Sequence, residues 1–320
     1  MRLSSRTCGR LAGLAAIVFA LVALVAPAAF ALTPEPVLTS RLDEFEPGAS
    51  DGYLAWTGNT ADHPRHTNIY VRALSGGKPI RVNERGTHGL QSSIDGTTVL
   101  YARATREEAS DLRLYDVRTG ERTAPGDRVN TRYWEFQPNI SGRYYFFERG
   151  KFRGPTQFTK AILYDRRTGR STVLADVDPR NAFLNTDQIN GDWLVWEFCN
   201  FTDGRYTDCD VFRYQISTGH TFRVPNPGVQ QYSPGVTSDG TVYYVRNGQR
   251  SHWKCGAHAR IVRYPVGGPA TVVASIPSKW DAFTNFALEG AYGVVTDYFD
   301  ESRCSNLRSD IYKIDDVPAG

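Results

Sequence analysis

The stretch SDGTVYYVR, residues 238–246, is a polar turn followed by a strand of β-branched and aromatic residues. The same pattern recurs around six glycines at intervals of 44 to 50 residues, namely Gly52, Gly96, Gly142, Gly191, Gly240 and Gly290. A fixed period in this range, with strand patterning in every unit, is typical of a β-propeller.

Each unit has a second landmark, a strand centred on an aromatic residue and followed by a glycine turn. Examples are DLRLY at 111–115 before Thr119-Gly120 and DVFRY at 210–214 before Thr218-Gly219. Alternating apolar residues predict half-buried strands, and the Asp-Gly and Thr-Gly pairs suit tight hairpins. Each unit therefore predicts four strands. A single such sheet cannot bury both its faces, whereas a ring of six can, so the sequence predicts an all-β, six-bladed β-propeller.

The sixth unit reaches Gly320 without a recognisable last strand, while residues 36–39 precede the first Asp-Gly with nothing to pair with. We expect this N-terminal segment to complete the last blade and to close the ring, because closure removes exposed sheet edges. No linker-like stretch interrupts the repeats. Residues 32–320 are therefore predicted to form one domain.

The turn at Ser238–Gly240, its variants at 94–96 and 140–142, and the Asp-Ile/Leu-x-x-Tyr strands at Asp111 and Asp310 resemble the WD40-like PD40 repeats of TolB-type six-bladed propellers. The resemblance covers the period of the whole chain after residue 31, but only about ten positions of each repeat in detail. It implies the fold. It leaves function open, because such repeats occur in envelope docking proteins, in accessory domains of peptidases and in some polysaccharide lyases.

The first 31 residues carry three arginines, an apolar run from Leu11 to Val25 and the sequence Ala29-Phe30-Ala31. This arrangement predicts a secretory signal peptide at 1–31, with an uncleaved membrane anchor as the alternative. Without this segment 34 basic residues face 34 acidic ones. A neutral chain gives no overall electrostatic reason to bind nucleic acid, and we expect no stable membrane insertion after cleavage.

Four cysteines follow the signal segment, and an even number in an exported protein suggests disulfides. Three pairings are possible. We favour Cys199 with Cys209, which flank one loop, and Cys255 with Cys304, which occupy equivalent loops of neighbouring repeats. No CxxC spacing supports a metal site, so we predict neither metal nor cofactor.

The loops after each second strand and those between blades are predicted to share one rim, here called the long-loop rim. Binding sites are disproportionately built from loops on a rigid scaffold. Aromatic residues recur in the blade connections, and one in each, such as Phe136 or Phe183, is expected to pack between blades. The predicted ligand-binding residues on the rim are Tyr133, Trp134, Glu135, His252, Trp253, Trp280 and Asp281. Exposed tryptophan beside acid and amide groups suits sugar rings or extended peptides, although Trp134 and Trp280 fit an interblade core equally well.

Five of the six histidines are also placed in these loops, namely His63, His66, His88, His252 and His258. They suit a metal or acid/base centre, but no spacing motif links them. Carboxylates such as Glu44, Glu46 and Glu135 are expected near a common channel mouth, where a pair would suit glycosidase chemistry. No nucleophile elbow, zinc-peptidase motif or nucleotide-binding loop occurs.

The sequence thus predicts a secreted or periplasmic, non-enzymatic binding module, monomeric, that recognises an envelope or extracellular protein or polysaccharide through its long-loop rim. The alternative is a secreted carbohydrate-active hydrolase or lyase that uses Glu135, Asp281 and His252.

Overall fold

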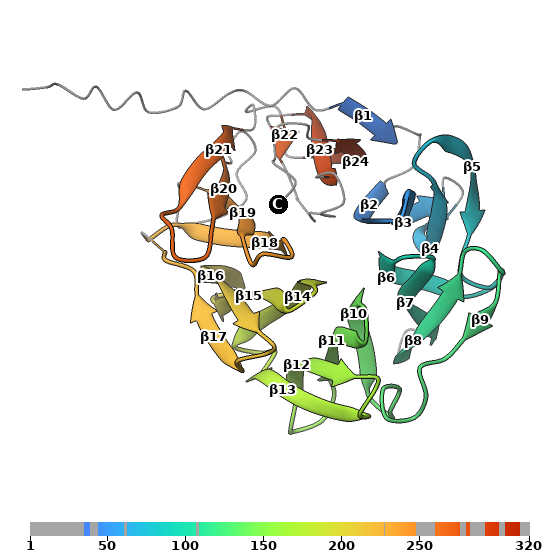
Figure 1. Cartoon of the computed structure of the whole chain (residues 1–320), viewed down its shortest axis with the longest axis horizontal. Coiled ribbons are helices and arrows are strands. Elements are labelled where there is room, and N and C mark those ends of the chain that lie inside the picture. The colour runs from blue at the N-terminus through green and yellow to red at the C-terminus, as the bar shows by residue number, and fades with distance from the viewer. Residues whose placement is uncertain are drawn as a thin grey trace, which may run out of the picture.

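The computed structural model describes residues 35–38, 44–60, 63–106, 109–226, 228–247, 260–275, 280–281, 292–300 and 305–313. Every regular element in these ranges is a β-strand. The strands form six four-stranded sheets arranged in a ring (Figure 1). Within the same ranges, no helix is long and apolar enough to cross a membrane.

Five of the sheets are built from four consecutive antiparallel strands each, and we number them blades 1 to 5. Blade 1 contains β2 (Glu44–Ser50), β3 (Tyr53–Thr60), β4 (His63–Ala73) and β5 (Gly76–Arg81). Blade 2 contains β6 (His88–Asp95), β7 (Thr98–Arg106), β8 (Ala109–Asp116) and β9 (Arg122–Thr123). Blade 3 contains β10 (Trp134–Ser141), β11 (Tyr144–Lys151), β12 (Phe158–Asp165) and β13 (Arg170–Val177). Blade 4 contains β14 (Ala182–Asn190), β15 (Trp193–Thr202), β16 (Arg205–Gln215) and β17 (His220–Arg223). Blade 5 contains β18 (Gln230–Val236), β19 (Val242–Asn247), β20 (Arg260–Tyr264) and β21 (Thr271–Ser275).

The sixth sheet joins the two ends of the chain. Its order is β22 (Trp280–Asp281), β23 (Tyr292–Asp300), β24 (Ser305–Lys313) and β1 (Glu35–Leu38). The segment predicted to complete the last blade does pair with it, since Pro36 lies opposite Tyr312. Side-chain packing is described for five blades and, in the sixth sheet, for β1 alone. The described side-chain packing thus establishes a propeller with five packed blades, not the six that the sequence predicts, and apart from β1 the sixth sheet is described by its strand pairing alone.

Strand alternation explains the packing between blades. The second strand of each blade is apolar on both faces, so that successive residues face opposite neighbours. In blade 3, Phe147 packs with Leu100 and Leu112 of blade 2. Its neighbour Phe146 packs with Leu184 and Leu194 of blade 4. Similar clusters join blades 1 and 2 and blades 4 and 5, while Leu38 of β1 packs on Leu54 and Trp56 of blade 1. The core is therefore a series of interblade layers.

In blades 1 to 3, the polar residue that ends the inner strand also bonds the next blade. Ser50 Oγ accepts the Gly96 N–H at 2.9 Å, and Asp95 Oδ2 accepts the Gly142 N–H at 2.7 Å. Ser141 Oγ continues the series with the Gly191 N–H at 3.0 Å. Turn chemistry alone would explain a Ser or Asp before glycine. Here the same residues also fix the spacing of the blades.

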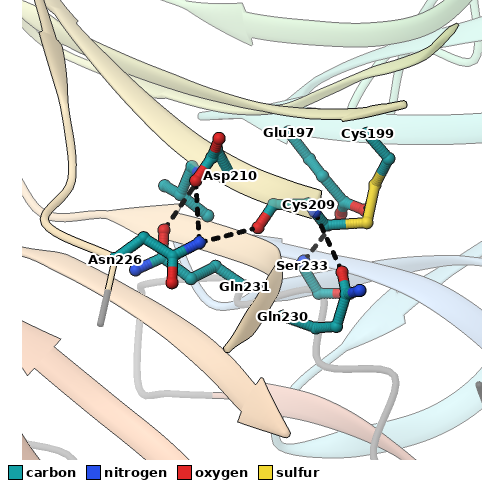
Figure 2. The surroundings of a disulfide bond; sticks show 9 residues. Glu197, Cys199, Cys209, Asp210, Asn226, Gln230, Gln231 and Ser233 are labelled. Carbon is teal, nitrogen blue, oxygen red and sulfur yellow. Dashed lines mark hydrogen bonds between the residues drawn. A yellow bond between two sulfur atoms is a disulfide. The ribbon is translucent and has the colours of Figure 1, made fainter. Parts of the chain in front are cut away.

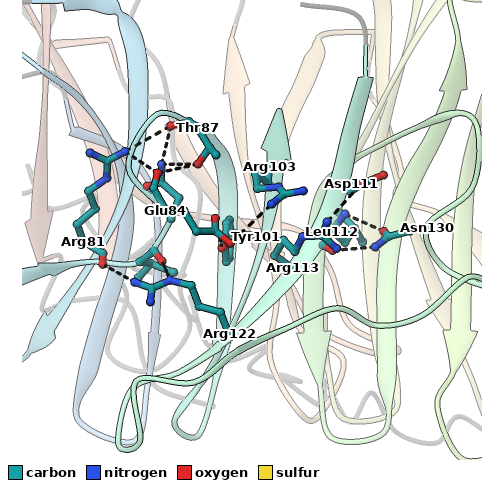
Figure 3. Close-up of polar contacts among 12 residues, drawn as sticks. Arg81, Glu84, Thr87, Tyr101, Arg103, Asp111, Leu112, Arg113, Arg122 and Asn130 are labelled. Atoms are coloured by element: carbon teal, nitrogen blue, oxygen red, sulfur yellow. Dashed lines mark hydrogen bonds and ion pairs between the residues drawn. The ribbon is translucent and has the colours of Figure 1, made fainter. Parts of the chain in front are cut away.

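A Val-Asn pair anchors each of two blade connections to the preceding sheet. In the first connection, Asn83 Oδ1 accepts the Ile69 N–H at 3.0 Å, and Val82 is fully buried. In the second, Asn130 bonds both the N–H and the C=O of Leu112, at 2.8 and 3.0 Å (Figure 3). The two asparagines thus bond the third strands of blades 1 and 2 to the outgoing chain and pair backbone groups that would otherwise be unsatisfied.

Candidate binding site at the long-loop rim

Blade 3 carries a pocket of about 420 Å³ where its inner and second strands meet the long-loop rim. The lining residues come from two separate stretches, Arg132–Trp134 and Gly150–Arg153. The first stretch enters β10, and the second leaves β11. The antiparallel register of these strands, with Trp134 opposite Gly150, brings the two stretches together. Tyr133 and Trp134, two of the predicted ligand-binding residues, are therefore part of this pocket.

Aromatic rings form the apolar wall of the pocket. Trp134 meets Phe152 edge to face, with ring centroids 5.7 Å apart, and Phe136 also lies 5.7 Å from Phe152. Phe152 is 38% exposed despite these contacts. Edge-to-face packing holds each ring in place while leaving other faces open to a ligand.

Gly150 makes this aromatic arrangement possible. A Cβ atom at position 150 would lie 2.6 Å from Cζ of Phe152 and 3.1 Å from Cε1 of Phe136. The absence of a side chain lets Phe152 fold back over β11 and meet Phe136. Any larger residue would displace the ring, because carbon atoms do not approach so closely.

The polar wall of the pocket is basic. Arg132, Lys151 and Arg153 line it, and none of the other lining residues that the structure describes is acidic. The Arg132 guanidinium donates a hydrogen bond of 3.0 Å to the Tyr133 hydroxyl. This bond, followed by the charges on Arg132, Lys151 and Lys160, lowers the pKa of the Tyr133 phenol. The phenol therefore senses a positive potential.

Glu135 does not line this pocket, contrary to its predicted place among the rim ligands. Strand alternation turns it to the face opposite Trp134 and Phe136, where it is fully buried. Its Oε1 accepts bonds from Thr131 Oγ1 at 2.7 Å and from Arg149 Nε at 2.9 Å. Burial raises the pKa of this carboxyl, while the bonds from Thr131 and Arg149 oppose the shift. Glu135 thus stabilises the blade from inside, and the alternation visible in the sequence predicts this orientation.

Blade 4 carries the predicted disulfide between Cys199 and Cys209, which links β15 to β16 near the same rim (Figure 2). Next to it, Gln230 Oε1 accepts the Cys209 N–H at 2.9 Å. Glu197 and the two cysteines lie close enough to hold a metal ion, but both sulfur atoms are bonded to each other. The cluster is therefore covalent and structural. The proposed partners Cys255 and Cys304 lie outside the described residues.

A second concave region, of about 280 Å³, lies among the inner strands of blades 1 to 4. Its lining extends from the middle of each inner strand to the Gly turns, so it belongs to the opposite half of the ring from the rim pocket. Most of its lining is polar, including Glu46, Gln91, Gln137 and Asp187. The sequence predicts Glu46 near a channel mouth but carries no signal for this cavity.

A β-bulge recurs at the same level of the inner strands of blades 1 to 5, and the bulges of blades 1 to 4 line this cavity. Positive φ angles between 48° and 54° mark four of these bulges, at Glu46, Gln91, Gln137 and Ser233. The inner strands of these four blades shift register at the same residues. In blade 4 the register shifts between Thr186 and Gln188. A bulge leaves a backbone group unpaired in its own ladder. Buried carboxylates of the preceding blade accept two of these groups, because Glu148 Oε1 binds the Thr186 N–H at 2.9 Å and Glu197 Oε2 binds the Ser233 N–H at 3.0 Å.

Burial raises the pKa of several acids around the bulges. It raises the pKa of Glu46 to about 7, and hydrogen bonds from Thr57 and Gln91 oppose the shift. It also raises the pKa of Glu148 well above its ordinary value, and the charge on Glu197 adds to the effect. The recurrence of an acid after an aromatic residue, in Phe147-Glu148 and Trp196-Glu197, is a sequence signal for these interblade acceptors.

The remaining predicted site residues are spread over other parts of the chain. His66 lies in β4 and His88 begins β6, rather than in loops, and their rings stack 4.3 Å apart across blades 1 and 2. Trp280 and Asp281 form β22, and the structure describes their backbone alone. Residues His252, Trp253 and His258 lie outside the described residues, as does the side chain of His63.

Known structures with a similar arrangement include TolB proteins and a prolyl endopeptidase. A protein of Agrobacterium tumefaciens assigned as TolB matches with a TM-score of 0.53 and 14% identity, over 87% of this chain and 92% of its own. TolB from Acinetobacter baumannii matches at 0.51 and 14%, over 82% of this chain and 64% of its own. A prolyl endopeptidase matches at 0.55 and 14%, over 89% of this chain and 43% of its own.

These similarities establish a β-propeller fold. The chain spans less than two thirds of the length of two of these three proteins, TolB of Acinetobacter baumannii and the endopeptidase. No protein-family model matches the sequence, and no curated protein does. At 14% identity the propeller neighbours define the scaffold, and the chemistry has to be argued from the residues themselves.

Proposed function

We propose that this chain is an exported, six-bladed propeller domain spanning residues 32–320 that binds an envelope or extracellular glycan or protein through its long-loop rim. Removal of a leader at 1–31 and an extracytoplasmic location are parts of the proposal, and the Cys199–Cys209 disulfide supports an oxidising compartment. The pairing of β1 with β24 supports closure by a sixth blade.

The observation that carries the proposal is the rim pocket of blade 3. Its open aromatic rings and convergent polar groups are the usual features of a ligand site. Among the described lining residues there is no carboxylate, histidine or hydroxyl-bearing nucleophile other than the Tyr133 phenol. Glu135, the acid proposed for a hydrolase or lyase, is enclosed and bonded to Thr131 and Arg149. The pocket therefore suits recognition better than bond cleavage.

Retention and turnover can be measured in one experiment. The purified chain is incubated with immobilised envelope and extracellular polysaccharides and proteins, and both bound protein and soluble fragments are quantified. We expect retention without fragments. Trp134→Ala should weaken retention by about 1–2 kcal/mol, or about 5- to 30-fold. Tyr206→Ala, which removes an exposed ring of blade 4, serves as the control and should retain wild-type binding. Released fragments would instead support the hydrolase or lyase alternative, and absence of retention on every surface would refute the binding role.

A further inference from the structure

The aromatic wall of the rim pocket continues beyond the pocket itself. Tyr133, which lines the pocket, meets Phe158 edge to face, with ring centroids 5.1 Å apart and an interplanar angle of 77°. Trp134, the next residue, makes the corresponding contact with Phe152 at 5.7 Å and 87°. Two neighbouring residues therefore each form an aromatic corner. We call Trp134 and Phe152 the first corner, and Tyr133 and Phe158 the second corner.

An ion pair lies at the edge of the second corner. The Lys160 Nζ atom lies 5.1 Å from the centroid of the Phe158 ring, and it pairs with Asp176 Oδ2 at 2.9 Å. Lys160 and Asp176 are opposite residues of β12 and β13, and their side chains are 32% and 52% exposed. The second corner thus has a hydrogen-bond donor and an acceptor beside its ring, both open to solvent.

These contacts form one continuous series along the rim of blade 3. It runs from the first corner through the pocket to the second corner, and it ends at the Lys160–Asp176 pair. The series begins where the chain leaves β11 and ends on β13, so it crosses the blade from the second strand to the outer strand. A ligand that uses its whole length must be extended rather than compact.

The chemistry of the series selects among extended ligands. Each corner suits the apolar face of a ring. Arg132 and Lys151 in the pocket are donors, and Asp176 at the far end is an acceptor, so the polar groups suit hydroxyls, which both donate and accept. A chain of linked sugars repeats a ring and its hydroxyls at every unit. A peptide presents rings only where its sequence supplies them.

We infer that the rim of blade 3 binds a linear glycan over two subsites, one at each aromatic corner. One sugar residue stacks in the first corner. A later residue of the same chain stacks in the second corner, with its hydroxyls on Lys160 and Asp176. This inference rests on the proposed function, because it names the ligand class of the same rim and adds a subsite to it.

Oligomers of increasing length test the inference on the intact chain. Two series, β-1,4-linked glucose and β-1,4-linked N-acetylglucosamine, each of one to six units, are titrated in parallel. We expect the hexamer of at least one series to bind about fivefold tighter per sugar unit than its monomer. The second corner contributes stacking only to a ligand that is long enough to reach it, and counting per unit removes the advantage of having more units.

Variants separate the two corners. Phe158→Ala should lower the affinity of the hexamer about fivefold and leave that of the monomer unchanged, whereas Trp134→Ala should weaken every length. Lys160→Gln/Asp176→Asn removes the exposed ion pair but no ring, and it should lower the affinity of the hexamer about threefold. Tyr206→Ala removes an exposed ring of blade 4 and should bind every length as the wild type does.

The possible failures are distinguishable. Equal affinity per sugar unit at every length, or a hexamer affinity that neither Phe158→Ala nor Lys160→Gln/Asp176→Asn changes, would overturn the second subsite. Retention of a protein with no glycan oligomer bound would overturn the ligand class and leave a binding rim in place. Absence of binding by every glycan and protein would refute the proposed function itself.

Discussion

Blades 3 and 4 have the same four-stranded plan, yet they differ in charge and in the length of the loop between the second and third strands. Blade 3 as a whole, residues 134–177 with their turns, contains eight basic and four acidic residues, whereas blade 4, residues 182–223, contains three and six. In blade 3 an open connection carries Phe152 back toward Trp134. In blade 4 the strands continue to a tight turn at Asp203-Gly204, where both residues have positive φ.

Aromatic rings occur at both rims, so aromatic content does not distinguish them. Tyr206 of blade 4 packs between Phe183 and Phe201, with centroids 4.9 and 5.3 Å away. These rings pack against one another in the blade that carries the Cys199–Cys209 disulfide. The rings of blade 3 surround a basic pocket instead. On this repeated scaffold, loop length and charge therefore distinguish the candidate binding site of blade 3 from the aromatic cluster of blade 4.

The largest effect is expected from the ion pair that supports blade 3. Arg149→Leu leaves the fully buried Glu135 without its cation, which should lower the free energy of unfolding by about 3 kcal/mol. Urea unfolding measures this loss. The double variant Glu135→Gln/Arg149→Leu should recover a large part of it, because no buried charge remains. An Arg149→Leu variant as stable as the wild type would show that Glu135 has another partner or role.

The disulfide is the corresponding support of blade 4. Cys199→Ser/Cys209→Ser should lower the free energy of unfolding by about 2–3 kcal/mol, because the unfolded chain gains freedom in a loop of sequence separation 10. Thermal and urea unfolding of the oxidised wild type and the variant measure the difference. Ligand affinity at blade 3 should stay the same. A parallel loss of affinity at fully folded conditions would mean that the two rims act as one site.

The buried acid of blade 4 gives a pH dependence. Burial raises the pKa of Glu197 from 4.5 to about 7, so the folded chain holds this proton more tightly than the unfolded chain. Stability from this group is therefore greatest below about pH 4.5 and declines as the pH rises toward 7. Glu197→Gln lacks this decline. The free energy of unfolding of the variant minus that of the wild type should therefore be about 1–3 kcal/mol larger at pH 8 than at pH 4.5.

Urea unfolding at both pH values, with exposed Glu121→Gln as a control, tests that expectation. A stability difference between Glu197→Gln and wild type that does not change with pH would contradict the burial of an ionisable group at this position.

The smallest effect on stability is expected from Gly150→Ala, which should nevertheless weaken ligand binding at the rim pocket. Gly150→Ala should cost about 1 kcal/mol or less, because the side chain that it strikes is the end of Phe152, which can swing outward. The corner between Trp134 and Phe152 should be lost, and glycan retention should fall several-fold. Unchanged retention would mean that Phe152 is not part of the binding surface.

Much of the scaffold is visible in the sequence, because it repeats. The glycine period gives the strands and turns, and the loop that separates Cys199 from Cys209 gives the disulfide. The pocket is less predictable. Tyr133 and Trp134 stand out by residue type, but Phe152 joins them only through the register of β10 and β11, in which Trp134 lies opposite Gly150.

Other features could not be predicted from the sequence, because the same residue type fits two structural roles. Glu135 looks like a rim acid until strand alternation is applied, and Ser50 or Asp95 look like turn residues until the next blade is in place. The inner-strand bulges have only a weak sequence signature, since Gln91 and Gln137 share a residue type whereas Glu46 and Ser233 have the same positive φ with other side chains. Sequence alone therefore locates the blades and leaves their mutual contacts to the structure.

The most direct test of the account is calorimetric titration of one retained ligand into three folded proteins. These are the wild type, Trp134→Ala and Tyr206→Ala. The account predicts that Trp134→Ala weakens binding at least about fivefold, by about 1 kcal/mol or more, while Tyr206→Ala binds as the wild type does. Equal affinity of Trp134→Ala and wild type, or a loss confined to Tyr206→Ala, would contradict the assignment of the binding site to blade 3.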